Sequence, residues 1–106
     1  MDETSQIAVP PSFIALFAQP GSPKLRESRA VIAARYELCE DLASWLTESA
    51  QTQLWDLGIT EDDVLERIHR GLRDAGSGLD EPEAQWVTRR LAELLGWADP
   101  RLGDAT

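Results

Sequence analysis

Cysteine, histidine and lysine each occur once in the 106 residues, and this scarcity excludes several kinds of site. The single Cys39 rules out an intrachain disulfide and a zinc site built from cysteines, and we expect its thiol to be buried. The chain has no Gly-x-x-x-x-Gly-Lys phosphate loop, no Gly-x-Ser-x-Gly nucleophile elbow and no Gly-x-Gly-x-x-Gly turn. We therefore expect no catalytic residue, no bound cofactor and no metal ion.

Long hydrophobic runs and a basic N-terminal segment are also missing. No apolar run approaches the roughly 20 residues that a membrane-spanning helix needs. The chain begins Met1-Asp2-Glu3, without the basic residues that open a signal peptide. We therefore expect a cytoplasmic protein that does not bind membranes.

The composition favours helices over strands. Leucine and alanine together number 27, whereas valine and isoleucine together number 9, and β-branched side chains lose more rotamer freedom in a helix. We find no alternating strand pattern. The predicted fold is all-α: a compact helical bundle of one long helix, two shorter helices and a short N-terminal helical segment. We expect a disordered N-terminus over residues 1–8, a single helical domain over residues 9–97 and a flexible tail over residues 98–106.

The long helix is expected from about Arg26 to Leu57, a stretch without proline or glycine, with a possible break near residues 47–49. Spacings of three and four between its apolar residues predict one buried stripe. The stripe consists of Val31, Ala34, Leu38, Leu42, Trp45, Leu46, Ala50, Leu54 and Leu57. Gly58 suits the left-handed position after the helix end.

Two shorter helices are expected from their capping residues. Thr60 precedes three acids that favour the first turn of a helix, and Asp80 with Glu83 forms a capping box. The inner face of the first helix is expected to hold Val64, Leu65, Ile68 and Leu72. That of the second is expected to hold Ala84, Val87, Leu91, Leu94 and Leu95, with Gly96 ending the helix.

The negative charge is concentrated in one stretch. Residues 36–66 contain nine acids and no base, whereas residues 1–35 carry a net charge of +1 and residues 67–106 a net charge of −1. The nine acids are Glu37, Glu40, Asp41, Glu48, Asp56, Glu61, Asp62, Asp63 and Glu66. They form either a solvated helix face or an electrostatic docking surface for a basic partner.

Two groups of apolar side chains are further candidates for partner contacts. Phe13, Ile14 and Phe17 belong to a helical segment too short to be stable alone, so they cover this chain's own core or dock into another protein. Trp55 and Trp86 lie beside the apolar stripes, and each is either a flank of the core or an exposed anchor.

Residues 50–68 are similar to a bacterial helix-turn-helix unit, with Gly58 and Ile59 at the turn. The recognition helix would then begin with three acids, which repel phosphates. This charge argues against a DNA-binding regulator, which we keep as an alternative. A metal-binding protein is a second alternative. Glu66 and His69 share a helix face, and Glu40 could contribute from the long helix, although we expect His69 to be a partly exposed helix residue.

Three segments carry a resemblance to a known family. They are Val9-Pro10-Pro11-Ser12-Phe13-Ile14-Ala15-Leu16-Phe17, Ala34-Arg35-Tyr36-Glu37-Leu38-Cys39-Glu40-Asp41-Leu42 and Leu57-Gly58-Ile59-Thr60-Glu61-Asp62-Asp63-Val64-Leu65-Glu66-Arg67. They resemble a family of small, functionally uncharacterised proteobacterial proteins over most of residues 9–97. Some members carry the automatic label "ATPase with chaperone activity", which the residues here do not support because the phosphate loop is missing.

The sequence therefore predicts a small acidic helical protein that acts as a non-enzymatic protein–protein interaction module. Its candidate interaction residues are Phe13, Ile14, Phe17, Glu40, Asp41, Glu48, Trp55 and Trp86. We expect a protein partner, basic in the simplest case, or a second copy of the chain as a homodimer, and neither nucleic acid nor membrane.

Overall fold

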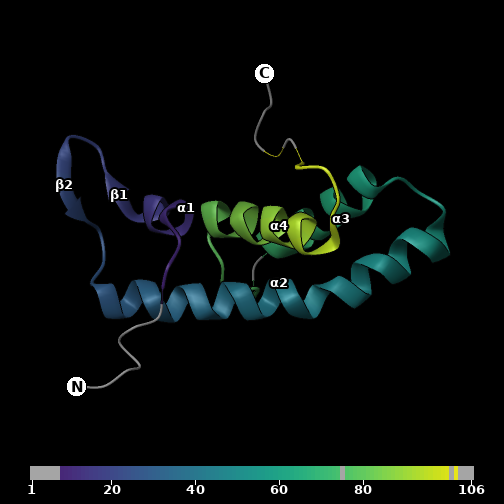
Figure 1. The fold of residues 1–106 in the computed structure, drawn as a ribbon. Helices are drawn as coiled ribbons and strands as arrows, with labels where there is room; N and C mark the ends of the chain where they lie inside the picture. Colours follow the sequence, from purple (N-terminus) through teal and green to yellow (C-terminus); the bar gives the residue numbers. More distant parts are fainter. Residues whose placement is uncertain (1–7, 75, 101, 103–106) are drawn as a thin grey trace. The chain divides into compact units, whose positions relative to one another are not determined.

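The computed structural model describes residues 8–74, 76–100 and 102 and is mostly helical, as predicted. Its elements are α1 (Pro11–Ile14), a 3₁₀ turn (Ala15–Phe17), β1 (Ala18–Gln19), β2 (Ser22–Leu25), α2 (Arg29–Leu57), α3 (Glu61–Arg73) and α4 (Glu81–Leu95) (Figure 1). The chain divides into two compact units, one up to Cys39 and one from Glu40 on, and each is described by itself. The single domain over residues 9–97 stays a prediction, and the expected disorder of residues 1–7 lies outside the described residues.

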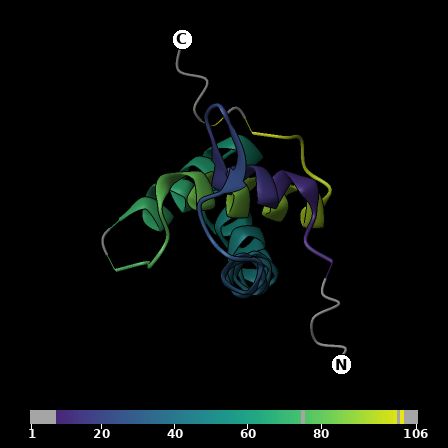
Figure 2. The ribbon, with the colours of Figure 1, turned by 90° about the vertical axis from the view of Figure 1, so that its left-hand side faces the viewer.

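The prediction of a strictly all-α fold is wrong, because β1 and β2 form an antiparallel hairpin in the first unit (Figure 2). Pro20 and Gly21 connect the strands in the order typical of a type II turn, and Gly21 has the positive φ of 72° that such a turn requires. The strands gave no alternating pattern because they are short and almost entirely exposed.

The N-terminal aromatic side chains pack within the first unit. Phe13 is fully buried, and its ring lies 5.6 Å from that of Phe17 and 5.6 Å from that of Tyr36, measured between centroids. Arg26, which follows β2, donates through its backbone N–H to the Phe17 carbonyl and through its guanidinium to the Leu16 carbonyl. The same guanidinium carbon lies 5.1 Å from the centre of the Phe17 ring. These contacts tie the hairpin end to the aromatic cluster.

α2 is one continuous helix without the break considered near residues 47–49. It begins after Ser28, whose hydroxyl accepts a hydrogen bond from the Val31 N–H at 3.2 Å, as an N-cap side chain does. It ends before Gly58, which has a φ of 64° and donates to the Leu54 carbonyl. The predicted end of the helix is therefore confirmed.

The buried stripe predicted along α2 is wrong in phase. Of its nine members only Ala50 is buried, and five are exposed: Val31, Ala34, Leu38, Trp45 and Leu57. The apolar side chains of α2 that are buried are Ile32, Cys39, Ala43 and Ala50. Apolar residues occupy more than one face of α2, so periodicity alone did not show which face is buried. Small side chains on the buried face permit close packing. Larger side chains such as Trp45 lie on the exposed face.

The helices of the second unit begin as their capping residues predict. The Thr60 side chain accepts a hydrogen bond from the Asp63 N–H, and Asp80 forms a complete capping box with Glu83. Gly96 ends α4 in the left-handed conformation, and the Trp97 N–H donates to the Ala92 carbonyl. α3 and α4 pack against each other in this unit (Figure 1).

The core of the second unit consists of small and branched apolar side chains. Those with less than a tenth of their surface exposed are Ala43, Ala50, Val64, Leu65, Ile68, Leu72, Ala84, Val87, Leu91 and Ala92. The predicted inner face of α3 is confirmed, whereas on α4 Leu94 is exposed and Leu95 is half-buried. Part of the predicted tail contacts this unit, since Pro100 is buried and Arg89 donates to the Leu102 carbonyl at 3.0 Å.

Candidate interaction surface

α2 carries the two most exposed large hydrophobic side chains of the described chain. Trp45 has 77% and Trp55 has 87% of its surface exposed. Together with Asp41, Glu48 and Thr52 they follow spacings of four, three, four and three residues, which place all five on one side of a helix. We call this set the tryptophan face, and it belongs entirely to the second unit.

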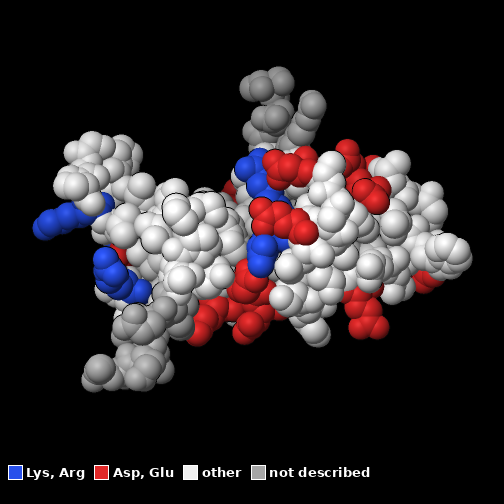
Figure 3. Space-filling view, in the orientation of Figure 1, with Lys and Arg blue, Asp and Glu red and all other residues white. Residues whose placement is uncertain are grey.

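The two carboxylates of the tryptophan face are not engaged in ion pairs with described residues. Asp41 and Glu48 are exposed and form no ion pair with another residue of the part of the chain that the structure describes. In Figure 3, acidic side chains lie along the lower edge of the view, where Figure 1 shows α2. An apolar surface flanked by uncompensated negative charge is suited to a partner that is both apolar and basic.

Glu40 has a different role from that of its neighbour Asp41. Its carboxylate accepts hydrogen bonds from Nε of Arg90 at 2.9 Å and from Nη2 at 2.9 Å, in a bidentate ion pair that connects α2 to α4. Hydrogen bonds to Glu40 and Glu93 raise the pKa of Arg90 above its ordinary value. Glu40, a predicted interaction residue, is therefore engaged within the second unit.

The other predicted interaction residues are less accessible. Phe13 and Phe17 are buried and Ile14 is half-buried, so they would have to leave their packing to dock on another protein. Trp86 is half-buried on α4. Of the tryptophans proposed from the sequence, only Trp55 is strongly exposed.

Sequence reasoning missed Trp45, which was assigned to the buried stripe. Two neighbours carried a usable signal: Asp41 lies one turn before Trp45 and Glu48 lies about one turn after it, on the same side of the helix. A side chain placed between two uncompensated carboxylates is more often on the solvent side than in a core.

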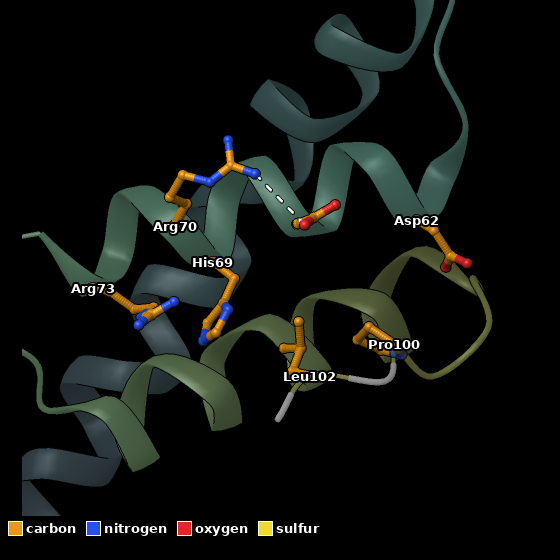
Figure 4. A pocket seen from close by; sticks show the side chains of 7 residues that line it. Asp62, His69, Arg70, Arg73, Pro100 and Leu102 are labelled. Atoms are coloured by element: carbon orange, nitrogen blue, oxygen red, sulfur yellow. Dashed lines mark ion pairs between the residues drawn. The ribbon is translucent and has the colours of Figure 1, made fainter. Parts of the chain in front are cut away.

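A second candidate region is an open hollow of about 430 Å³ beside α3 (Figure 4). Its lining residues are Asp62, Glu66, His69, Arg70, Arg73, Pro100 and Leu102. Ion pairs engage several of them: Glu66 lies 3.6 Å from Arg70, and Glu81 of α4 lies 2.8 Å from Arg73. Among the charged side chains that line the hollow, Glu66, Arg70 and Arg73 are thus already in ion pairs.

His69 is buried, and the prediction that it is partly exposed is wrong. Its Nε2 lies 3.1 Å from Oε2 of Glu81, which satisfies the imidazole where α4 begins. Oε2 of Glu81 also accepts a hydrogen bond from Gln85 at 2.8 Å. The hydrogen bond from Gln85, together with the charges of His69 and Arg73, lowers the pKa of Glu81 against an opposing effect of burial. The histidine thus joins the end of α3 to the start of α4.

The structure places the residues of the two alternative functions as follows. Among residues 8–74, 76–100 and 102, no three His, Cys, Asp or Glu side chains lie close enough to hold a metal ion. Glu61, Asp62 and Asp63 stay exposed in the first turn of α3, where a recognition helix would face DNA. None of the described helices has the length and apolar character needed to cross a membrane.

Comparisons with known proteins give no relative. No family model matches the chain, and neither a curated protein nor a solved structure is similar to it.

Proposed function

We propose that this chain is a non-enzymatic interaction module that binds a protein partner through the tryptophan face of α2. The observation that carries the proposal is the exposure of Trp45 and Trp55 on one side of one helix. Tryptophan is enriched among the residues that dominate binding energy, because it buries a large area when a partner covers it. Two such side chains left in water on one helix face are therefore suited to binding.

The charge around the tryptophans supports the same proposal. Asp41 and Glu48 add a long-range attraction for a basic partner, which speeds encounter more than it adds affinity. Phosphate groups would meet these carboxylates with the wrong sign, so a protein partner is favoured over nucleic acid. A cytoplasmic location and the relationship to the proteobacterial family belong to this proposal as well.

The test compares the native chain with a variant that lacks both indoles. The double variant Trp45→Ala, Trp55→Ala is used as bait in crosslinking from the host cell, beside wild type and a Leu57→Ala control. Leu57 is also exposed on α2 but lies on another side of the helix. We expect wild type and the control to capture the same protein and the double variant to lose it, with unchanged circular dichroism. Equal capture by all three proteins would overturn the proposal.

A further inference from the structure

We infer that the tryptophan face recognises an arginine-bearing segment of the partner, with guanidinium groups stacked on the two indoles and hydrogen-bonded to the two carboxylates. This inference rests on the proposed function and adds the chemistry of the occupant. It depends on how Asp41, Trp45, Glu48 and Trp55 follow one another along α2.

The spacing places a carboxylate on each side of Trp45, whereas Trp55 lies two turns from the nearest carboxylate of the face. Asp41 precedes Trp45 by one turn, Glu48 follows it by about one turn, and Trp55 follows Glu48 by two turns. At about 1.5 Å rise per residue, the two indoles start about 15 Å apart along the helix axis. An extended or helical segment of the partner with two arginines can therefore reach both indoles at once.

Arginine fits this surface better than lysine. A planar guanidinium stacks on an aromatic face and still presents N–H groups at its edge to a carboxylate, whereas an ammonium is a compact and strongly hydrated charge. Trp45 has Asp41 one turn before it and Glu48 about one turn after it, so stacking and hydrogen bonding are both available to one guanidinium there, and Trp55 offers a second stacking surface.

The chain itself contains both halves of this geometry. Arg26 places its guanidinium carbon 5.1 Å from the centre of the Phe17 ring, and Arg90 forms a bidentate pair with Glu40 at 2.9 Å. The tryptophan face offers both the aromatic ring and the carboxylate that an arginine contacts. It has no cation of its own, since residues 36–66 contain neither lysine nor arginine.

The charge also argues against a second copy of this chain on the same face. In a symmetric antiparallel pair centred on Glu48, the Glu48 carboxylates of the two copies would face each other. These two carboxylates would then repel each other, and residues 36–66 hold no lysine or arginine to compensate them. A basic segment of another protein avoids that repulsion.

The test uses alanine-based helical peptides that present basic residues at the i, i+3, i+7 and i+10 spacing of the tryptophan face. One labelled peptide carries arginine at these positions, one carries lysine and one carries glutamine. Binding to the full chain is measured by fluorescence anisotropy at low and moderate salt. We expect the arginine peptide to bind about threefold to tenfold more tightly than the lysine peptide, and the glutamine peptide not to bind.

Variants assign the binding to the face. Trp45→Leu and Glu48→Gln should each weaken the arginine peptide, and Trp45→Leu should also remove the preference for arginine over lysine. Glu27→Gln removes one exposed negative charge outside α2 and should change affinity little. Equal binding of the arginine and lysine peptides, or equal losses from Glu48→Gln and Glu27→Gln, would overturn the inference.

The outcomes separate this inference from the proposed function. If the arginine peptide does not bind but cellular capture still requires both indoles, the inference fails and the interaction module stands. If capture does not require the indoles, the proposed function fails. Sedimentation of the free chain tests the remaining occupant, because a dimer that dissociates on Trp45→Leu would place a second copy on the face and overturn the inference.

Discussion

Arg90 and Glu40 form a bidentate ion pair across fifty residues of sequence, while Asp41, the next residue after Glu40, is exposed without an ion pair to any described residue. Two adjacent carboxylates of one acidic stretch therefore have separate roles. The first connects α4 to α2, and the second belongs to the tryptophan face.

Removing the ion pair should cost stability that removing Asp41 does not. Glu40→Gln should lower the free energy of unfolding by about 1–2 kcal/mol, because the partly buried Arg90 loses a charged acceptor. Asp41→Asn should stay within about 0.5 kcal/mol of wild type. Urea unfolding of both variants checks this, and equal effects would show that the Arg90 pair contributes nothing specific.

Replacing the buried Phe13 should lower the free energy of unfolding far more than replacing the exposed Trp55. Because its ring is fully buried, Phe13→Ala should cost about 3–5 kcal/mol, whereas Trp55→Ala should cost less than about 0.5 kcal/mol. Thermal and urea unfolding measure both values. A Phe13→Ala variant as stable as wild type would mean that the N-terminal segment is not part of the folded unit.

Replacement of two glycines by alanine should change the stability of the fold in opposite directions. Gly21 has a φ of 72° and no atom within 4 Å of an added Cβ, so Gly21→Ala should destabilise by about 1–2 kcal/mol through backbone strain alone. Gly71 lies inside α3 with equally open space, and Gly71→Ala should stabilise by about 0.5–1 kcal/mol. Chemical denaturation of both variants checks the signs. A neutral Gly21→Ala would argue against the turn of the β1–β2 hairpin.

Acid should weaken the contact between α3 and α4 through Glu81. Its pKa is lowered below 4.5 in the folded chain, chiefly by the hydrogen bond from Gln85. A depressed carboxyl pKa stabilises the fold above the unfolded value and loses that contribution as the pH falls through the folded value. Glu81→Gln should therefore be less stable than wild type near neutral pH, with the difference shrinking below pH 4.5.

The control for this pH dependence is Glu66→Gln, which removes a more exposed carboxylate that pairs with Arg70 of its own helix. Its unfolding free energy should follow that of wild type closely across the same pH range. A constant difference between Glu81→Gln and wild type at every pH would contradict the assigned role of Glu81.

Local signals predicted the ends of the helices better than their burial. Thr60, Asp80, Gly58 and Gly96 act through hydrogen bonds and φ values that depend on a few neighbouring residues, and all four were predicted correctly. The buried side of α2 depends on which elements approach it. The sequence of α2 does not show that the small Ala43 is buried while the larger Leu38 is exposed.

The candidate site was predicted in part for the same reason. Asp41, Glu48 and Trp55 were named from charge and composition, but their neighbour Trp45 was assigned to the core. The pairing of Glu40 with Arg90 joins residues fifty positions apart, and no local pattern distinguishes Glu40 from Asp41. His69 was misjudged because its partner, Glu81, comes from the next helix.

The most direct measurement of the central claim is oxidative footprinting of the four tryptophans, with and without the arginine peptide. In the free chain Trp45 and Trp55 should oxidise faster than the half-buried Trp86 and Trp97. Addition of the peptide should protect Trp45 and Trp55 while Trp86 and Trp97 stay unchanged. Unchanged oxidation of Trp45 and Trp55 at a peptide concentration that saturates binding would contradict the account, because the ligand would then occupy another surface.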